Sequence, residues 1–515
     1  MAELKRISHV SIFLLFIYVA KSLLAIAVRT SMTTCFGAGI ETDAYFAAFT
    51  IPQTLSDFFI GGILFIVIIP VFQKRMAEVG QDEASRDLSS LLNVSLLLLT
   101  LIAGLYCVLV PLIMPFIFSG FEGHKLELTI RFSMIFSPSI ILMGMSLIYT
   151  SIYHSFREFF VPSIAALVFP VSSLLSIWCL PDSWGIERLV YGNLTGSLIG
   201  LVIMLVFIFK RVKWCWNWKL SNPIIKSAFI LSWPVLLESV FSRIVPVIHK
   251  SIASGLPEKN AVTLIELSLF VIGSIVGFIS GPVSTAVYPL MGQQSIENDE
   301  KTVFQTFFKS LNVIFFLTVP FNVLLLTDSR EIVGVLFEYG KFTVNDGELT
   351  SKILMILSFV ILPNCFLSLS GRIFFIFHDT KMVSYCMILT VCLFIPIYYI
   401  GAKVLGIYGL VTAAALGAIL GNIVSGIVLK LKHKDISFTG PLIYLLKIVA
   451  CGILMAFTII MARMIFSTPW MHPAYKLLID SSLGFVSYII YCKLLMVGEM
   501  RYVIERMPAL KFKRR

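Results

Sequence analysis

The chain has 515 residues, of which 58% are hydrophobic and only 13% are charged, and its formal net charge is +11. A soluble protein of this length carries about twice that share of charged residues, so the composition excludes a set of soluble domains. It predicts an all-α protein that lies almost entirely within a membrane.

Apolar runs of about 20 residues recur from end to end, and each is long enough to cross a hydrocarbon core as a helix. They predict about fourteen spans, at 10–32, 44–72, 90–117, 128–153, 160–181, 189–209, 227–252, 261–289, 306–327, 350–377, 382–402, 405–429, 441–465 and 473–497. The first run continues past Lys21 without a small-residue cleavage site, so we expect a permanent span and not a signal peptide.

Basic residues concentrate in the short loops on one side of these spans and in the C-terminal tail, which predicts that both termini are cytoplasmic. The segment 210–219 alternates basic residues with three tryptophans at the end of a span, a pattern typical of an interfacial belt on anionic lipid. Because the membrane accounts for the positive charge, we expect no nucleic-acid partner. The nine cysteines show no metal-ligand spacing, so we expect no metal and no cofactor.

The sequence contains a weak internal repeat at an offset of about 220 residues. Tyr191–Thr195 matches Tyr408–Thr412, and Leu92–Val94 matches Leu311–Val313 in the same order. Six spans per unit give both halves one orientation, so the halves should be related by an axis along the membrane normal. We therefore predict two parallel six-helix lobes, 1–220 and 221–435, followed by two extra helices and a basic tail, 436–515.

Charged residues within spans cost roughly 2.5–3.5 kcal/mol each on insertion scales and therefore need a reason. Lys21 and Arg29 in the first span occupy places that match Arg243 and Lys250 in the seventh. Cations that face each other from two lobes suit an anionic, phosphate-bearing substrate. The alternative is internal ion pairing, for example between Glu238 and Arg243.

One stretch carries a family resemblance. Phe36–Phe49 reads F-G-A-G-I-E-T-D-A-Y-F-A-A-F and is followed by Pro52, which resembles the MviN/MurJ family of lipid II flippases in the MOP exporter superfamily. The likeness continues at Leu336–Thr343 and Gly371–Phe375. It implies two six-helix lobes around a cationic cavity and passage of an undecaprenyl-diphosphate-linked sugar from the inner to the outer leaflet.

The chain also departs from the family pattern. The arginine pair of span two would fall at Ser56 and Asp57, and the Asp-Arg pair of span eight near Leu269 and Phe270, whereas Asp43 carries over cleanly. Peptidoglycan lipid II remains the first expected substrate. Another lipid-linked oligosaccharide, for O-antigen, capsule or exopolysaccharide, remains a rival.

These observations predict a non-enzymatic flippase of the bacterial inner membrane that works as a monomer by alternating access. The predicted substrate-binding residues are Lys21, Arg29, Asp43, Asp57, Glu238, Arg243 and Lys250. Coupling to an ion gradient or to the membrane potential stays open. An ion-coupled exporter of small molecules would need an acidic cavity, and a membrane glycosyltransferase would need catalytic carboxylates in a sizeable outer loop.

Overall fold

The computed structural model describes residues 2–497 apart from 62–63, 157, 209–211, 213, 219–239, 241–242, 259, 298, 378–379, 434–436, 467–471 and 496. Every regular element in this described part is helical, which confirms the all-α prediction. The chain forms two compact units. Unit 1 comprises Met1–Thr263 and Tyr339–Thr343, and unit 2 comprises Leu264–Glu338 and Val344–Arg515.

The helices of unit 1 are α1 (Ala2–Phe36), α2 (Ile40–Gly61), α3 (Leu64–Val79), α4 (Gln81–Ile117), α5 (Gly123–Ser155), α6 (Phe160–Cys179), the short η1 (Asp182–Trp184), α7 (Glu187–Ile208) and a helix at residues 243–254. α2 and α4 pack on α5, and α1 packs on α6. α5 bends by 41° at Pro138, whose ring removes one backbone hydrogen bond.

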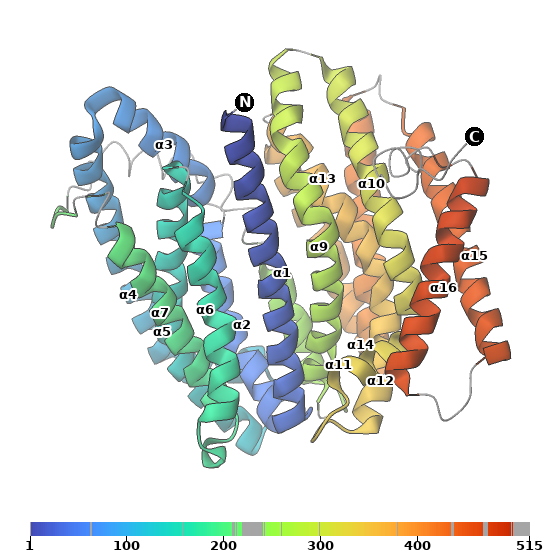
Figure 1. Cartoon of the computed structure of the whole chain (residues 1–515). Helices are drawn as coiled ribbons and strands as arrows, with labels where there is room; N and C mark the ends of the chain where they lie inside the picture. The colour runs from blue at the N-terminus through green and yellow to red at the C-terminus, as the bar shows by residue number, and fades with distance from the viewer. Residues whose placement is uncertain are drawn as a thin grey trace. The chain divides into compact units, whose positions relative to one another are not determined.

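α6 and α7 lie side by side (Figure 1), and small residues line the seam between them. Gly192, Gly196 and Gly200 recur at every fourth position of α7, and a Cβ at Gly192 would collide with the Ser176 side chain. A Cβ at Gly196 would come within 2.9 Å of the Ser172 Cβ. This spacing of small residues lets two helices approach closely without any hydrophobic drive from water.

The helices of unit 2 are α9 (Ala261–Ile296, from Leu264 onward), α10 (Glu300–Thr327), α11 (Ser329–Phe337), α12 (Val344–Leu357), the short η2 (Ser358–Val360), α13 (Ile361–Ile376), α14 (Thr380–Lys432), α15 (Thr439–Phe466) and α16 (Pro473–Leu494). α14 joins two helices at Gly406, where φ is 58° and ψ is −137°. This break lies next to the boundary that the sequence places between spans 382–402 and 405–429.

α15 and α16 lie beside α10 (Figure 1). The three helices pack together through a buried apolar cluster. Its members include Val319 and Val323 from α10, Met455 from α15 and Tyr488 from α16. The two C-terminal helices, which fall outside the sequence repeat, are thus an integral part of the core of unit 2.

Ten helices in the described part are long and apolar enough to cross a membrane, or eleven if the bent α5 is one span. The chain is therefore a multi-pass membrane protein. The count of fourteen stays a prediction, because spans 44–72 and 227–252 run into residues outside the described part.

Candidate functional site

One face of α2 gathers most of the charged residues that the sequence singles out. Asp43, Phe46, Thr50 and Asp57 follow one another at spacings of three, four and seven residues, so they share a side of the helix. At 1.5 Å per residue, the face runs for about 21 Å. Each of these four side chains contacts a different partner, and three of the partners are cations from the predicted set.

Asp43 marks one end of this face and is only 1% exposed. Lys125 Nζ, from the first turn of α5, donates to its carboxylate at 2.7 Å. The backbone N–H of Thr263 donates at 2.7 Å, and the Thr263 hydroxyl at 2.5 Å. Because Thr263 is the third residue of α9, the carboxylate satisfies a free N–H at a helix N-terminus, where negative charge is favoured.

Arg29 and Lys250 meet the middle of the face. The Arg29 guanidinium lies over the Phe46 ring, 4.7 Å from its centre. Lys250 Nζ, in the helix at residues 243–254, donates to the Thr50 hydroxyl at 2.8 Å. A guanidinium over an aromatic ring keeps its positive charge, which can attract an anionic ligand.

Asp57 and Arg243 form an ion pair further along α2. Arg243 Nη1 donates to Asp57 Oδ2 at 2.7 Å, with the two side chains 45% and 23% exposed. This pair accounts for an acidic residue at a place where the resembling family prefers a base, because the base stands opposite on a second helix. Internal pairing of Arg243 is thus real, although its described partner is Asp57, while Glu238 lies outside the described residues.

The α2 face brings four cations together. Arg29, Lys125, Arg243 and Lys250 each contact a side chain of this face, which carries the carboxylates of Asp43 and Asp57. Guanidinium and ammonium groups in this number suit a diphosphate. Lys21 stands apart: its side chain is exposed on α1 and makes no ion pair with any residue in the described ranges.

Two of the motifs that carry the family resemblance touch each other in unit 1, although about 300 residues separate them. The Lys341 backbone N–H donates to the Thr34 carbonyl at 2.9 Å. Gly37 and Gly340 both have positive φ, 70° and 59°, and a Cβ at Gly37 would come within 2.7 Å of the Lys341 carbonyl oxygen. Glycine is needed on both sides of this contact because the backbones meet directly.

Sequence reasoning missed Lys125 and Thr263 as parts of the site. Lys125 reads as an ordinary loop lysine, and Thr263 as one hydroxyl among many in an apolar span. No local pattern signals that both reach Asp43, since the partners lie 82 and 220 residues away from it.

Two other arginines within spans, Arg131 and Arg372, have partners on neighbouring helices. Arg131 pairs with Glu187 at 3.0 Å on the surface of unit 1. In unit 2, Arg372 Nη1 on α13 donates to the Ser284 carbonyl of α9 at 2.6 Å. These residues support helix packing and do not lie on the α2 face.

Arg463 is the centre of a buried charged cluster in unit 2. Its guanidinium donates to Asp480 at 2.8 Å, to the Thr327 carbonyl at 2.9 Å and to Asp328, and it lies 3.7 Å from Glu331. Lys476 also donates to Glu331, so two cations meet three carboxylates. The cluster fastens the ends of α15 and α16 to the turn between α10 and α11.

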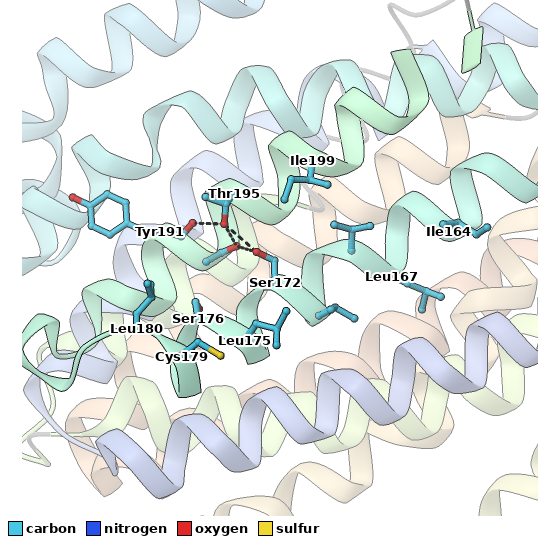
Figure 2. Close-up of a pocket in the computed structure, with 13 residues that line it drawn as sticks. Ile164, Leu167, Ser172, Leu175, Ser176, Cys179, Leu180, Tyr191, Thr195 and Ile199 are labelled. Atoms are coloured by element: carbon cyan, nitrogen blue, oxygen red, sulfur yellow. Dashed lines mark hydrogen bonds between the residues drawn. The ribbon is translucent and has the colours of Figure 1, made fainter. Parts of the chain in front are cut away.

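A pocket with a volume of about 580 Å³ opens between α6 and α7 (Figure 2). Its walls are mainly aliphatic, and the hydroxyl of Ser172 already donates to the Gly192 carbonyl at 2.8 Å and lies 3.0 Å from that of Thr195. None of the predicted site residues lines it. The pocket is therefore separate from the α2 face. No group of His, Cys, Asp and Glu side chains in the described part is arranged to hold a metal ion.

A family model described as lipid II flippase MurJ matches residues 32–479 of the chain. The chain belongs to the MurJ lipid II flippase family. This confirms the resemblance that rests on Phe36–Phe49. It also makes the protein a member of a transporter family and not of an enzyme family.

Relatives and solved structures agree with this assignment. A probable lipid II flippase MurJ of Bdellovibrio bacteriovorus is 25% identical over 447 residues, 82% of this chain and 83% of the relative. One of Thermotoga maritima is 24% identical over 480 residues, 92% and 93% of the two chains.

Among solved structures, lipid II flippase MurJ in an inward closed conformation superposes with a TM-score of 0.81 at 22% identity, covering 96% of this chain and 100% of that one. An inward-facing MATE family transporter of the MOP superfamily has a TM-score of 0.67 at 14% identity, covering 81% and 96%. At these identities the likeness shows the fold alone, and the fold is that of MOP transporters.

Proposed function

We propose that this protein moves lipid II, the undecaprenyl-diphosphate-linked precursor of peptidoglycan, from the inner to the outer leaflet of the bacterial cytoplasmic membrane. The observation that carries the proposal is the α2 face of a MurJ family member, where the cations Arg29, Arg243 and Lys250 gather. In the proposed mechanism, Arg29, Arg243 and Lys250 hold the diphosphate while the polyprenyl tail stays in lipid. Charge-assisted hydrogen bonds from these groups are the strong contacts available to a phosphate.

The wider architecture belongs to the same proposal. We infer fourteen spans, with lobes at 1–220 and 221–435 and two further helices in 436–515, and both termini in the cytoplasm because basic residues concentrate on that side. The protein works as a monomer by alternating access. The proposal includes no cofactor and allows coupling to an ion gradient or to the membrane potential.

A second substrate class stays in view because of Asp57. The arginine pair that the family pattern places at Ser56 and Asp57 is missing, and one base stands at Arg243 instead. A site with a different layout of cations suits a different glycan on the same lipid diphosphate.

The test is depletion of the protein in its host, followed by assay of the lipid-linked precursors on the inner leaflet. Accumulation of lipid II with cell lysis supports a peptidoglycan flippase. Accumulation of another undecaprenyl-linked glycan with an intact wall reassigns the substrate and keeps the mechanism. Accumulation of neither precursor refutes the proposal.

A further inference from the structure

Three tryptophans form a ladder just after α7. Trp214 and Trp216 meet edge to face with ring centres 5.3 Å apart, and Trp216 and Trp218 do so at 5.5 Å. Contact between alternate residues places the three rings on one side of a non-helical stretch. The side chains are 43%, 70% and 42% exposed, although tryptophan is among the residues that bury the most apolar area.

α4 holds this ladder in place from behind. The Asn93 side-chain amide donates to the carbonyls of Cys215 and Asn217, at 3.2 and 3.0 Å, and its oxygen accepts from Trp214 Nε1 at 3.1 Å. The Cys215 N–H donates to the Ser89 hydroxyl at 3.2 Å. Asn93 and Ser89 are both buried, so the segment is fixed before any ligand arrives, which lowers the entropic cost of binding.

The ladder also presents unused donors and a strong positive charge. The indole N–H groups of Trp216 and Trp218 donate to no residue in the described ranges. The ten residues from 210 to 219 contain three lysines and one arginine and no acidic residue. Indole rings and basic residues together at the end of a span fit the level of phospholipid headgroups, and basic segments there attract anionic lipids.

We propose that Trp214–Trp218, fixed on α4 by Asn93, is a headgroup-binding site for anionic phospholipids. The rings lie among the glycerol and upper acyl groups, the indole N–H groups of Trp216 and Trp218 donate to lipid oxygens, and the neighbouring basic residues select the negative headgroup. This site is distinct from the α2 face and does not depend on the transported substrate.

The experiment uses the full chain in vesicles of phosphatidylglycerol and phosphatidylcholine at one fixed ratio. The tryptophans outside the ladder are replaced by phenylalanine: Trp178, Trp184, Trp233 and Trp470. Bromine, a quencher of indole fluorescence, is placed on the phosphatidylglycerol in one set of vesicles and on the phosphatidylcholine in the other. We expect quenching by brominated phosphatidylglycerol to be at least about twofold stronger.

Equal quenching by the two lipids overturns the proposal, because the ladder would then be an interfacial anchor with no headgroup preference. Absence of quenching overturns it as well, since the ladder would lie outside the bilayer or under a protein partner. A variant that keeps only Trp178, on α6, is the matched control and should show no preference. Asn93→Leu should abolish the stronger quenching of the ladder by brominated phosphatidylglycerol, whereas quenching of the Trp178 control that carries the same substitution should not change. If the ladder keeps its preference for phosphatidylglycerol in Asn93→Leu, the proposed role of α4 is wrong.

Discussion

The ion pair between Asp57 and Arg243 gives a directional prediction about substrate binding. In the proposed mechanism a diphosphate must draw Arg243 away from Asp57, so the carboxylate competes with the ligand for the same guanidinium. Asp57→Asn removes the competing charge and should strengthen binding of a polyprenyl diphosphate. Arg243→Gln removes the guanidinium that contacts the diphosphate and should weaken binding.

The size of the effect follows from the geometry. Two unit charges about 4 Å apart interact by about 4 kcal/mol at an effective dielectric constant of 20. Arg243 is 45% exposed, however, and exposed pairs measured by double-mutant cycles contribute only 0.2–1 kcal/mol. We therefore expect about 1 kcal/mol, or about a fivefold change in affinity, in opposite directions for the two variants.

The assay is titration of the purified full chain with undecaprenyl diphosphate in detergent, at low and at high salt. Arg131→Gln is the matched control, because it breaks an exposed pair away from the α2 face and should leave the affinity unchanged. Raising the salt concentration should shrink the gain in Asp57→Asn, since screening weakens the competition. If Asp57→Asn weakens binding as much as Arg243→Gln does, the pair only orders the two helices and the competition argument is wrong.

Three further predictions concern stability. Arg463→Gln leaves two buried carboxylates without their shared cation and should lower the free energy of unfolding by about 3–5 kcal/mol, measured as the thermal midpoint of the purified protein. Burial and the neighbouring Asp480 raise the pKa of Asp328, which lies in the turn between α10 and α11, to about 7, whereas an unfolded aspartate has a pKa of about 3.9. Between these two pKa values the folded protein holds a proton on Asp328 that the unfolded chain releases. The stabilisation from this protonation is therefore complete below about pH 4 and is lost as the pH rises through 7. Asp480→Asn should make the free energy of unfolding less dependent on pH over this range. Gly340→Ala places a Cβ against a backbone oxygen of α1 at φ 59° and should cost about 1–3 kcal/mol, whereas Gly371→Ala, where a Cβ meets nothing within 4 Å, should not.

Each of these has an outcome that contradicts it. Equal thermal midpoints for Arg463→Gln and for Arg131→Gln, the exposed counterpart, would show that the buried cluster contributes no more than a surface pair. If stability falls with rising pH as steeply in Asp480→Asn as in the unchanged protein, Asp480 is not a cause of the raised pKa of Asp328. Equal midpoints for the two glycine variants would show that the contact between α1 and the segment Tyr339–Thr343 tolerates a side chain.

Hydropathy predicts most of the helices because the membrane requires about 20 apolar residues per span, which is a local property of the sequence. The face of α2 could also be found locally, since Asp43, Thr50 and Asp57 recur at multiples of seven residues. The partners could not. Arg243 lies 186 residues from Asp57, and Lys125 lies 82 residues from Asp43, so only the packing of distant helices brings them together.

Because its partner is distant in the sequence, the role of Asp57 could not be predicted either. Taken alone, an acidic residue in a cationic cavity weakens the case for an anionic substrate. Paired with Arg243, it has another role, because the pair ties α2 to the helix at residues 243–254 only while no anion competes for the guanidinium. A ligand that binds Arg243 more tightly when Arg243 is released from Asp57 favours the state in which the ion pair is broken. The size of this shift is set by the difference between the ligand's affinities for the two states. In the proposed mechanism, substrate binding and the relative motion of these two helices of unit 1 are one equilibrium, which is the coupling that an alternating-access transporter requires.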